Sequence, residues 1–195
     1  MITTDAIKKL RDETGVSVMQ CKKALEEAGG DVAKAIVILK KRGADAANKK
    51  ADRILHAGVI ASYVHATGNV GAMVELACET DFVAKNPEFK QLAYDIAMHI
   101  VASKPEFLKK EDITQEARDL ALSVFEKEVA GKAKEMKEKI LEGKLTAYFS
   151  EHVLLDQPFI KNPDLMVSEL IHGAVQKFGE KMELVRFVRF GVLEK

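Results

Sequence analysis

Two carboxylates, Glu79 and Asp81, stand two residues apart, and Phe82 directly follows the second of them. Paired carboxylates can serve as general acid and general base, which would make this segment the active site of a small hydrolase. If this segment has no function, Phe82 is a core residue, because phenylalanine is most often buried, and Asp81 caps a helix.

These residues lie between two segments that differ in hydrophobic period. Before them, residues 70–78 alternate between apolar and other side chains, which predicts a strand. After them, Asn86 and Pro87 are typical of the N-cap and the first position of a helix, and apolar residues then recur three and four apart. Functional side chains often gather at a junction between rigid elements. We therefore expect the chain to present residues 79–86 at a corner.

The first 43 residues are predicted to form a docking module of three short helices. A hydroxyl or aspartate side chain stands where each helix would begin, and a glycine stands where each would end. The residues concerned are Thr3 or Thr4, Gly15, Ser17, Gly29, Gly30, Asp31 and Gly43. Residues 44–53 are rich in alanine and lysine and have little apolar periodicity, which predicts a polar linker with helical tendency.

The remaining residues, 54–195, are predicted to form an α+β core. Strands at residues 58–64 and 70–78 would make an antiparallel hairpin, and residues 182–192 would add a third strand to give a three-stranded antiparallel sheet packed with helices. Helices are expected after Pro87, in two or three pieces between residues 114 and 152, and from Val167 to Phe178. Residues 162–164 are expected to be a turn.

The last predicted strand carries apolar residues on both faces. Simple alternation places Leu184 on the same face as Val188 and Phe190, whereas Val185 and Phe187 point the other way. A strand with one solvated face would show a polar set on that face. A second chain could therefore cover one face of this sheet.

Composition argues against several classes of protein, without excluding a local basic patch that binds nucleic acid. The 30 basic and 30 acidic residues balance, so no overall charge attracts nucleic acid or an anionic membrane. Cys21 and Cys78 each lie in an apolar pattern, which favours buried thiols in a reducing compartment over a disulfide framework. No leader peptide and no apolar run of about 20 residues is seen. We expect a soluble cytoplasmic protein without direct nucleic-acid or membrane partners.

The sequence lacks the common catalytic and cofactor-binding motifs. No dinucleotide fingerprint, phosphate-binding loop, nucleophile elbow or zinc-protease motif occurs. The five histidines show no ligand spacing with cysteine or carboxylate, and each is expected to be a surface or capping residue. We therefore expect no metal, no cofactor and no enzymatic activity.

Three other functions stay open on the residues alone. Residues 3–43 could form a helical docking or binding module without further activity. Glu79 and Asp81 could serve a small hydrolase, as described above. The lysine-rich residues 126–144 could bind RNA, although such a charged run is usually a solvated helical face.

Three blocks of the sequence resemble one known family. LRDETG at residues 10–15, followed by CKKAL at residues 21–25, looks like the N-terminal signature of translation elongation factor Ts. ELACETDFVAK at residues 75–85 looks like its second signature, and FGEK at residues 178–181 resembles a third block. The resemblance runs over nearly the whole chain, and the length is similar to the short forms of the family.

This resemblance implies a fold, a partner and a set of site residues. The N-terminal helices would form a UBA-like module, and the protein would be a guanine-nucleotide exchange factor for elongation factor Tu, a GTPase. Mg²⁺ dislocation in that partner would be the work of Thr80, Asp81, Phe82 and Val83. The resemblance further implies partner contacts at Val18, Met19, Lys22, Phe178 and Gly179. Short forms resemble homodimers, which would give a 2:2 complex with the GTPase.

Overall fold

The protein is described here by a computed structural model, which covers residues 2–129 and 134–194. Two compact units divide the chain. The first unit contains residues 1–98 and 168–195, and the second contains residues 99–167. The division into a module, a linker and a core that the sequence suggested stays a prediction.

Three helices open the first unit, as the capping pattern predicts. They are α1 (Thr4–Thr14), α2 (Val18–Glu27) and α3 (Val32–Asn48). The side chains of Thr3, Ser17 and Asp31 each accept a hydrogen bond from a backbone N–H of the first turn that follows. The three helices share an apolar core of their own, which consists of Leu10, Val16, Cys21, Ala24, Leu25, Ala35 and Leu39.

Helix α3 does not end at Gly43, so that prediction is wrong. The helix continues to Asn48, through much of the stretch expected to be a linker. Gly43 is buried, and a Cβ atom at this position would lie 3.3 Å from the carbonyl oxygen of His172. His172 belongs to helix α8 (Val167–Phe178). The glycine thus allows close approach of two helices. From the sequence alone, a glycine with this role cannot be distinguished from one that ends a helix.

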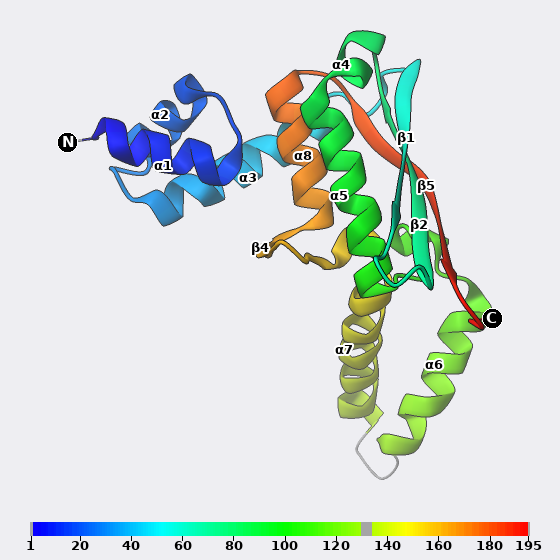
Figure 1. Cartoon of the computed structure of the whole chain (residues 1–195). Helices are drawn as coiled ribbons and strands as arrows, with labels where there is room; N and C mark the ends of the chain where they lie inside the picture. The colour runs from blue at the N-terminus through cyan, green and yellow to red at the C-terminus, as the bar shows by residue number, and fades with distance from the viewer. Residues whose placement is uncertain (1, 130–133, 195) are drawn as a thin grey trace. The chain divides into compact units, whose positions relative to one another are not determined.

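A three-stranded antiparallel sheet forms the centre of the first unit and confirms the predicted α+β class. Its strands are β1 (Ala57–Val64), β2 (Val70–Cys78) and β5 (Met182–Gly191), in the order β1-β2-β5 (Figure 1). The pairing of β1 with β2 is regular from Ala57 opposite Cys78 to Val64 opposite Gly71. The hairpin and its added third strand are therefore those that the two-residue period predicts.

A β-bulge in β5 overturns the predicted assignment of its faces. Leu184 pairs with Leu76 and Arg186 pairs with Glu75, so Val185 is an extra residue with no partner in β2. One extra residue reverses the alternation of side chains beyond it. Leu184 is therefore buried, whereas Val188 and Phe190 point away from the core.

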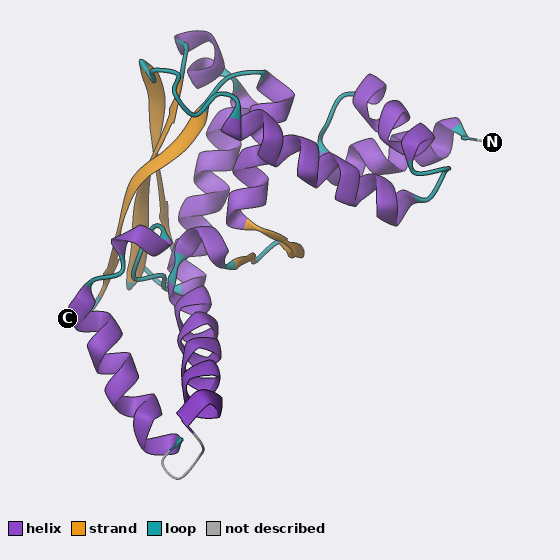
Figure 2. Ribbon diagram, turned by 180° about the vertical axis from the view of Figure 1, so that it is seen from behind, coloured by secondary structure: helices purple, strands orange, loops and turns teal. Residues whose placement is uncertain are grey.

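Helices α5 (Pro87–Ser103) and α8 lie side by side against one face of the sheet (Figures 1 and 2). The apolar residues of α5 at three and four spacing point inward, and Phe89 is fully buried. Its ring meets the edge of the Phe178 ring, with 6.5 Å between centroids. This layer of helices on one side leaves the other face of the sheet open.

The second unit is mainly helical. It contains α6 (Gln115–Glu128), α7 (Lys134–His152), two short 3-10 helices (Lys110–Asp112 and Leu154–Asp156) and a small sheet of β3 (Pro158–Phe159) and β4 (Asn162–Met166). The described part of residues 114–152 forms two helices, in agreement with the two or three predicted. Residues 162–164 begin a strand, so the prediction of a turn there is wrong. Residues 130–133 of the proposed RNA-binding segment lie outside the described residues.

His99 was expected to be a surface or capping residue, but it is completely buried in the second unit. Its Nε2 lies 2.9 Å from Oε1 of Gln157, and the backbone N–H of Ile160 donates to its Nδ1 at 3.3 Å. An Nδ1 that accepts a hydrogen bond carries no proton, so Nε2–H donates to the glutamine. The network therefore fits a neutral histidine, and burial lowers the pKa of His99.

Acid should therefore destabilise this unit. Because the pKa of His99 is lower in the folded protein than in the unfolded chain, the unfolded chain binds more protons once the pH falls below about 6.5. His99 then lowers the free energy of unfolding by up to about 1.4 kcal/mol per pH unit. Urea unfolding between neutral and mildly acidic pH measures this slope. The His99→Gln variant should show a shallower slope, because it lacks the group that binds the additional proton in the unfolded chain. Equal slopes for the wild type and His99→Gln would contradict the assignment.

Candidate functional site

The predicted corner contains a single turn of helix, α4 (Asp81–Lys85), directly after strand β2. Thr80 is its N-cap, and the Thr80 hydroxyl accepts a hydrogen bond from the backbone N–H of Val83 at 3.5 Å. The turn ends at Asn86, whose extended backbone leads directly into α5. Two rigid elements, a central strand and a long helix, therefore hold this turn at both ends.

The turn divides its side chains between the interior and the solvent. Val83 and Ala84 are buried, at 3% and 8% exposure. Phe82 is 80% exposed, and the interpretation of Phe82 as a core residue is therefore wrong. Asp81 stands beside it with 75% of its side chain exposed. Phenylalanine is most often buried, so an exposed ring on an anchored turn is available for contact with a partner protein.

The segment before the turn is bound to distant parts of the first unit. The Glu180 carboxylate accepts the backbone N–H of Thr80 at 3.0 Å and the Thr80 hydroxyl at 2.6 Å. In the opposite direction, the Glu79 carboxylate accepts the backbone N–H of Lys181, and it also pairs with Arg53 at 3.1 Å. The thiol of Cys78 donates to the carbonyl oxygen of Thr80 at 3.2 Å. Side chains more than 20 residues away thus fix the backbone that leads to Phe82.

The charges of the corner disagree with a hydrolase. The pKa of Glu79 is lowered, first by the backbone N–H of Lys181 and further by Arg53. The pKa of Asp81 is lowered by its hydrogen bond and ion pair with Lys85, 2.5 Å away. Acid–base catalysis by two carboxylates needs one of them to hold a proton at working pH. Both shifts favour the charged form, so neither residue is prepared to act as a general acid.

Three of the predicted partner-binding residues lie on helix α2. Val18 and Met19 form part of its first turn and are 51% and 67% exposed. The Lys22 side chain is also exposed, 3.9 Å from Glu26 on the same helix. These side chains form one accessible surface on an element whose other side packs into the core of the three N-terminal helices.

Helices α2 and α3 are both joined to α8 by polar contacts. Nε2 of Gln176 donates to Oε1 of Gln20 at 2.7 Å, and Lys40 of α3 pairs with Glu169 at 2.9 Å. Because α8 leads directly to Glu180, one helix connects both groups of predicted contact residues.

The other two predicted contact residues end helix α8. Gly179 has a φ of 76°, which is the left-handed conformation that terminates a helix and favours glycine. Phe178 is half-buried, and its ring packs against that of Phe89. This pair is connected to the corner through the next residue, Glu180, whose carboxylate accepts hydrogen bonds from Thr80.

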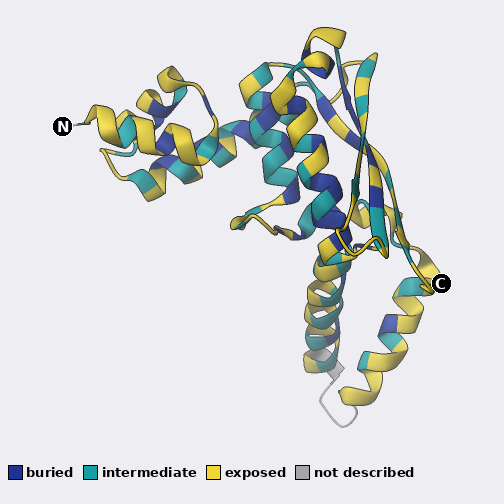
Figure 3. Ribbon diagram, in the orientation of Figure 1, coloured by how far each residue is buried: buried dark blue, intermediate teal, exposed yellow. Residues whose placement is uncertain are grey.

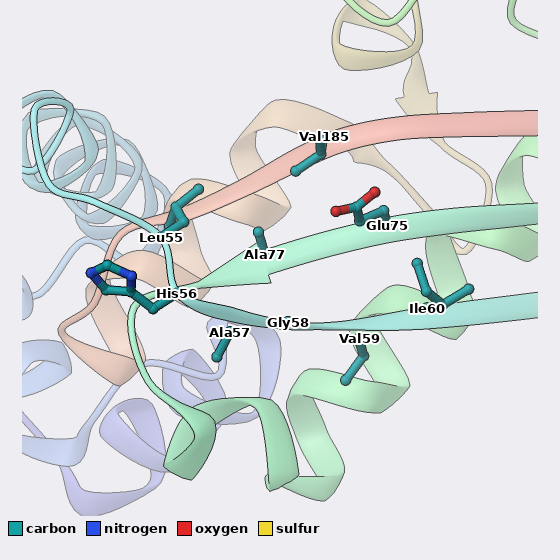
Figure 4. A pocket seen from close by; sticks show the side chains of 9 residues that line it. All are labelled: Leu55, His56, Ala57, Gly58, Val59, Ile60, Glu75, Ala77 and Val185. Carbon is teal, nitrogen blue, oxygen red and sulfur yellow. The ribbon is translucent and has the colours of Figure 1, made fainter.

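The open face of the sheet carries a second set of exposed apolar side chains. Figure 3 shows that exposed positions recur along the strands. Ile60, Met73, Val188 and Phe190 are 58%, 46%, 40% and 69% exposed. A hollow lies next to them, where Gly58 and Ala77 provide little side chain. Figure 4 shows Leu55 and His56 at one end of this hollow and Ile60 and Glu75 at the other. An apolar face of this kind on a sheet typically marks an interaction surface.

Among the residues that the structure describes, no three side chains of His, Cys, Asp and Glu gather in a way that could hold a metal ion. Within residues 2–129 and 134–194, no helix combines the length and the apolar character that crossing a membrane requires.

Sequence reasoning missed the roles of Glu180 and Arg53. Both act on residues 79 and 80 from positions far away along the chain, so no local spacing could indicate them. The only available signal was the position of Glu180 within the third block of the family resemblance.

Comparison with known proteins gives a consistent result. The family model described as Elongation factor TS matches residues 47–194. A protein named elongation factor Ts from Thermodesulfovibrio yellowstonii is 50% identical over 98% of this chain and 96% of its own length. Those from Carboxydothermus hydrogenoformans and Thermosipho melanesiensis are 48% and 46% identical, over 97% and 100% of this chain and 88% and 100% of their own lengths. The chain therefore belongs to the elongation factor Ts family and is a translation elongation factor of protein biosynthesis.

Proposed function

We propose that the protein is a guanine-nucleotide exchange factor for elongation factor Tu. It would bind the GDP-bound GTPase, dislodge Mg²⁺ and disturb the phosphate site, so that GDP leaves and GTP can bind. The observation that carries this proposal is the 80% exposure of Phe82 on an anchored turn. Membership of the elongation factor Ts family supports the choice of partner.

The residues of the corner would divide the work. Asp81 and Phe82 would enter the cleft beside the Mg²⁺ site, Thr80 would hold the turn, and buried Val83 would anchor it from inside. Mg²⁺ requires near-ideal octahedral geometry, so a small displacement of its ligands weakens binding sharply. Phosphates in such GTPases depend on aligned backbone N–H groups at the start of a helix. An apolar ring that becomes buried offsets the cost of disturbing both.

Binding energy must also come from elsewhere in the protein. The factor has to weaken GDP binding, and by linkage GDP weakens the factor by the same ratio. A thousandfold effect corresponds to roughly 4 kcal/mol. Burial of one phenylalanine supplies only about 1.5–3 kcal/mol. We propose that Val18, Met19 and Lys22 anchor the complex and that Phe178 and Gly179 add a contact near the corner.

The test is the release of a fluorescent GDP analogue from elongation factor Tu, followed by stopped flow as the concentration of this protein is increased. The proposal requires faster release that saturates with concentration. Binding to the GTPase without faster release would favour the alternative, a helical docking module. Such a factor performs no covalent chemistry and would act in the cytoplasm together with its partner.

We further propose that the open face of the sheet joins two copies of the chain into a homodimer, giving a 2:2 complex. Exposed Met73 lies directly opposite Val188, and Gly71 lies opposite Phe190, so the exposed side chains form a continuous strip over β2 and β5. The ion pair between Glu75 and Arg186, at 2.6 Å, borders this strip. A second copy presents the same strip, which is the self-complementary arrangement that a two-fold dimer uses.

Replacing Met73 by lysine should dissociate such a dimer, because it places a charge within the apolar strip. Analytical ultracentrifugation at micromolar concentration should show a dimer for the wild type and a monomer for Met73→Lys. Met136→Lys, which changes a 58% exposed methionine on α7, is the matched control and should stay dimeric. A monomeric wild type, or a Met73→Lys variant that remains dimeric, would rule out this interface.

A further inference from the structure

The corner and the turn between α8 and β5 hold each other through two crossed carboxylates. Glu180 receives the backbone N–H of Thr80, and Glu79 receives the backbone N–H of Lys181. Each segment thus supplies both an acceptor side chain and a donor backbone group to the other. We name these two contacts, together with the Thr80 hydroxyl bond to Glu180, the carboxylate brace.

We propose that Glu180 is a positioning residue that sets the direction in which Asp81 and Phe82 project towards the partner. The proposal rests on the exchange function proposed above and adds a residue to it. Glu180 does not itself reach the partner's nucleotide site in this account. It acts through Thr80, the N-cap of α4, which lies two residues after the end of strand β2.

The chemistry of the Thr80 contact requires a carboxylate. Both Thr80 groups that face Glu180 are donors, and the two carboxylate oxygens accept one each, at 3.0 and 2.6 Å. A hydroxyl that donates to an anion at this distance makes a strong, charge-assisted hydrogen bond. The proton of the hydroxyl therefore points to Glu180, which leaves its oxygen free to accept the N–H of Val83. Glu180 thus fixes the same hydroxyl that caps α4.

The brace is also tied to the chain that precedes the sheet. Arg53 pairs with Glu79 at 3.1 Å, and the ammonium group of Lys181 donates to the carbonyl oxygens of Ala51 and Arg53 at 2.6 and 3.1 Å. Three segments that are distant in sequence therefore meet behind the corner. An exposed ring that must displace groups in another protein needs such support, because a loosely held turn would yield instead.

Hydrogen exchange in the isolated protein tests whether the brace orders the corner. Glu180→Ala should speed exchange of the Thr80 and Val83 amides about tenfold or more, while amides of the sheet centre stay unchanged. Glu180→Gln, which keeps one acceptor, should lie between this variant and the wild type. Glu142→Ala removes an exposed carboxylate of α7, in the second unit, and should change neither amide. Unchanged exchange in Glu180→Ala would overturn the proposal.

A double-mutant cycle with Phe82 tests whether the brace serves exchange. Glu180→Ala should lower the maximal rate of GDP release about fivefold to tenfold, with a smaller change in the half-saturating concentration. If Glu180 acts through the corner, adding Glu180→Ala to Phe82→Ala should cause little further loss. Fully additive losses, or a Glu180→Ala maximal rate equal to that of the wild type, would refute the positioning role.

Two further variants distinguish failure of the carboxylate brace from failure of the proposed exchange function. Thr80→Ser keeps the hydroxyl and should preserve the amide protection, whereas Thr80→Val should lose it as Glu180→Ala does. This pair also decides the question if Glu180→Ala does not fold. If the wild-type protein failed to speed GDP release at all, the proposed exchange function would be wrong, and hydrogen exchange would still decide whether the brace orders the corner.

Discussion

Phe82→Ala should slow factor-stimulated GDP release from elongation factor Tu by about tenfold to a hundredfold. The ring is 80% exposed in the free protein, so its apolar surface can be buried only in the complex. Loss of that burial removes about 1.5–3 kcal/mol, and each 1.4 kcal/mol corresponds to a factor of ten. Stopped-flow release of fluorescent GDP at saturating factor measures the change.

The same variant should leave the fold unaltered. Because Phe82 makes little use of its ring within the chain, the free energy of unfolding should change by less than about 0.5 kcal/mol. Phe82→Leu, which keeps an apolar side chain of smaller area, should fall between alanine and the wild type in release rate. Release that is equally fast with Phe82→Ala would show that the ring does not enter the partner's site.

Phe89→Ala should have the largest effect on stability. This ring lies only seven residues beyond Phe82, yet it is completely buried and packs edge to face against the Phe178 ring of α8. Truncation of a buried phenylalanine to alanine typically lowers the free energy of unfolding by 3–5 kcal/mol, through lost burial and the cavity that remains. Small proteins have only about 5–15 kcal/mol in total. Urea or thermal unfolding followed by circular dichroism provides the measurement.

Phe89→Leu is the matched control, because it keeps most of the apolar volume and should cost clearly less than alanine. Comparison with Phe82→Ala then separates two kinds of aromatic residue within one short segment. A Phe89→Ala variant as stable as the wild type would mean that α5 does not pack against α8 through this ring.

Periodicity was sufficient to predict most elements of the fold. The alternation in residues 70–78 and the three-four spacing after Pro87 each reflect one buried face, and each led to the observed strand or helix. The N-terminal caps at Thr3, Ser17 and Asp31 were equally clear, since a cap acts on a backbone group only two or three residues away. Interactions between residues close together in the chain therefore produce patterns that can be recognised in the sequence.

The errors arose where the cause lies elsewhere in the chain. Gly43 marks a close approach to His172, which belongs to another helix, and nothing near residue 43 indicates that contact. The burial of His99 depends on Gln157 and Ile160, about 60 residues away. Likewise, Phe82 and Phe89 are the same residue type, and only the packing of the complete unit decides which ring is exposed.

The candidate site shows the same limit. Family resemblance pointed to residues 80–83, but the division between outward Asp81 and Phe82 and inward Val83 follows from the single turn of α4. The support behind that turn joins residues 79 and 80 to residues 180 and 181, a separation that no short motif spans.

The surplus residue Val185 makes β5 a strand of two halves. Before it, Met182 and Leu184 point into the interior of the unit. After it, Val188 and Phe190 point to the opposite side. This reversal of side-chain direction depends on the number of residues in the strand. The strand can therefore accept many side chains at position 185 but no change in its length. Removing this one residue would turn Val188 and Phe190 inward and expose those residues of the second half of β5 that now face the interior.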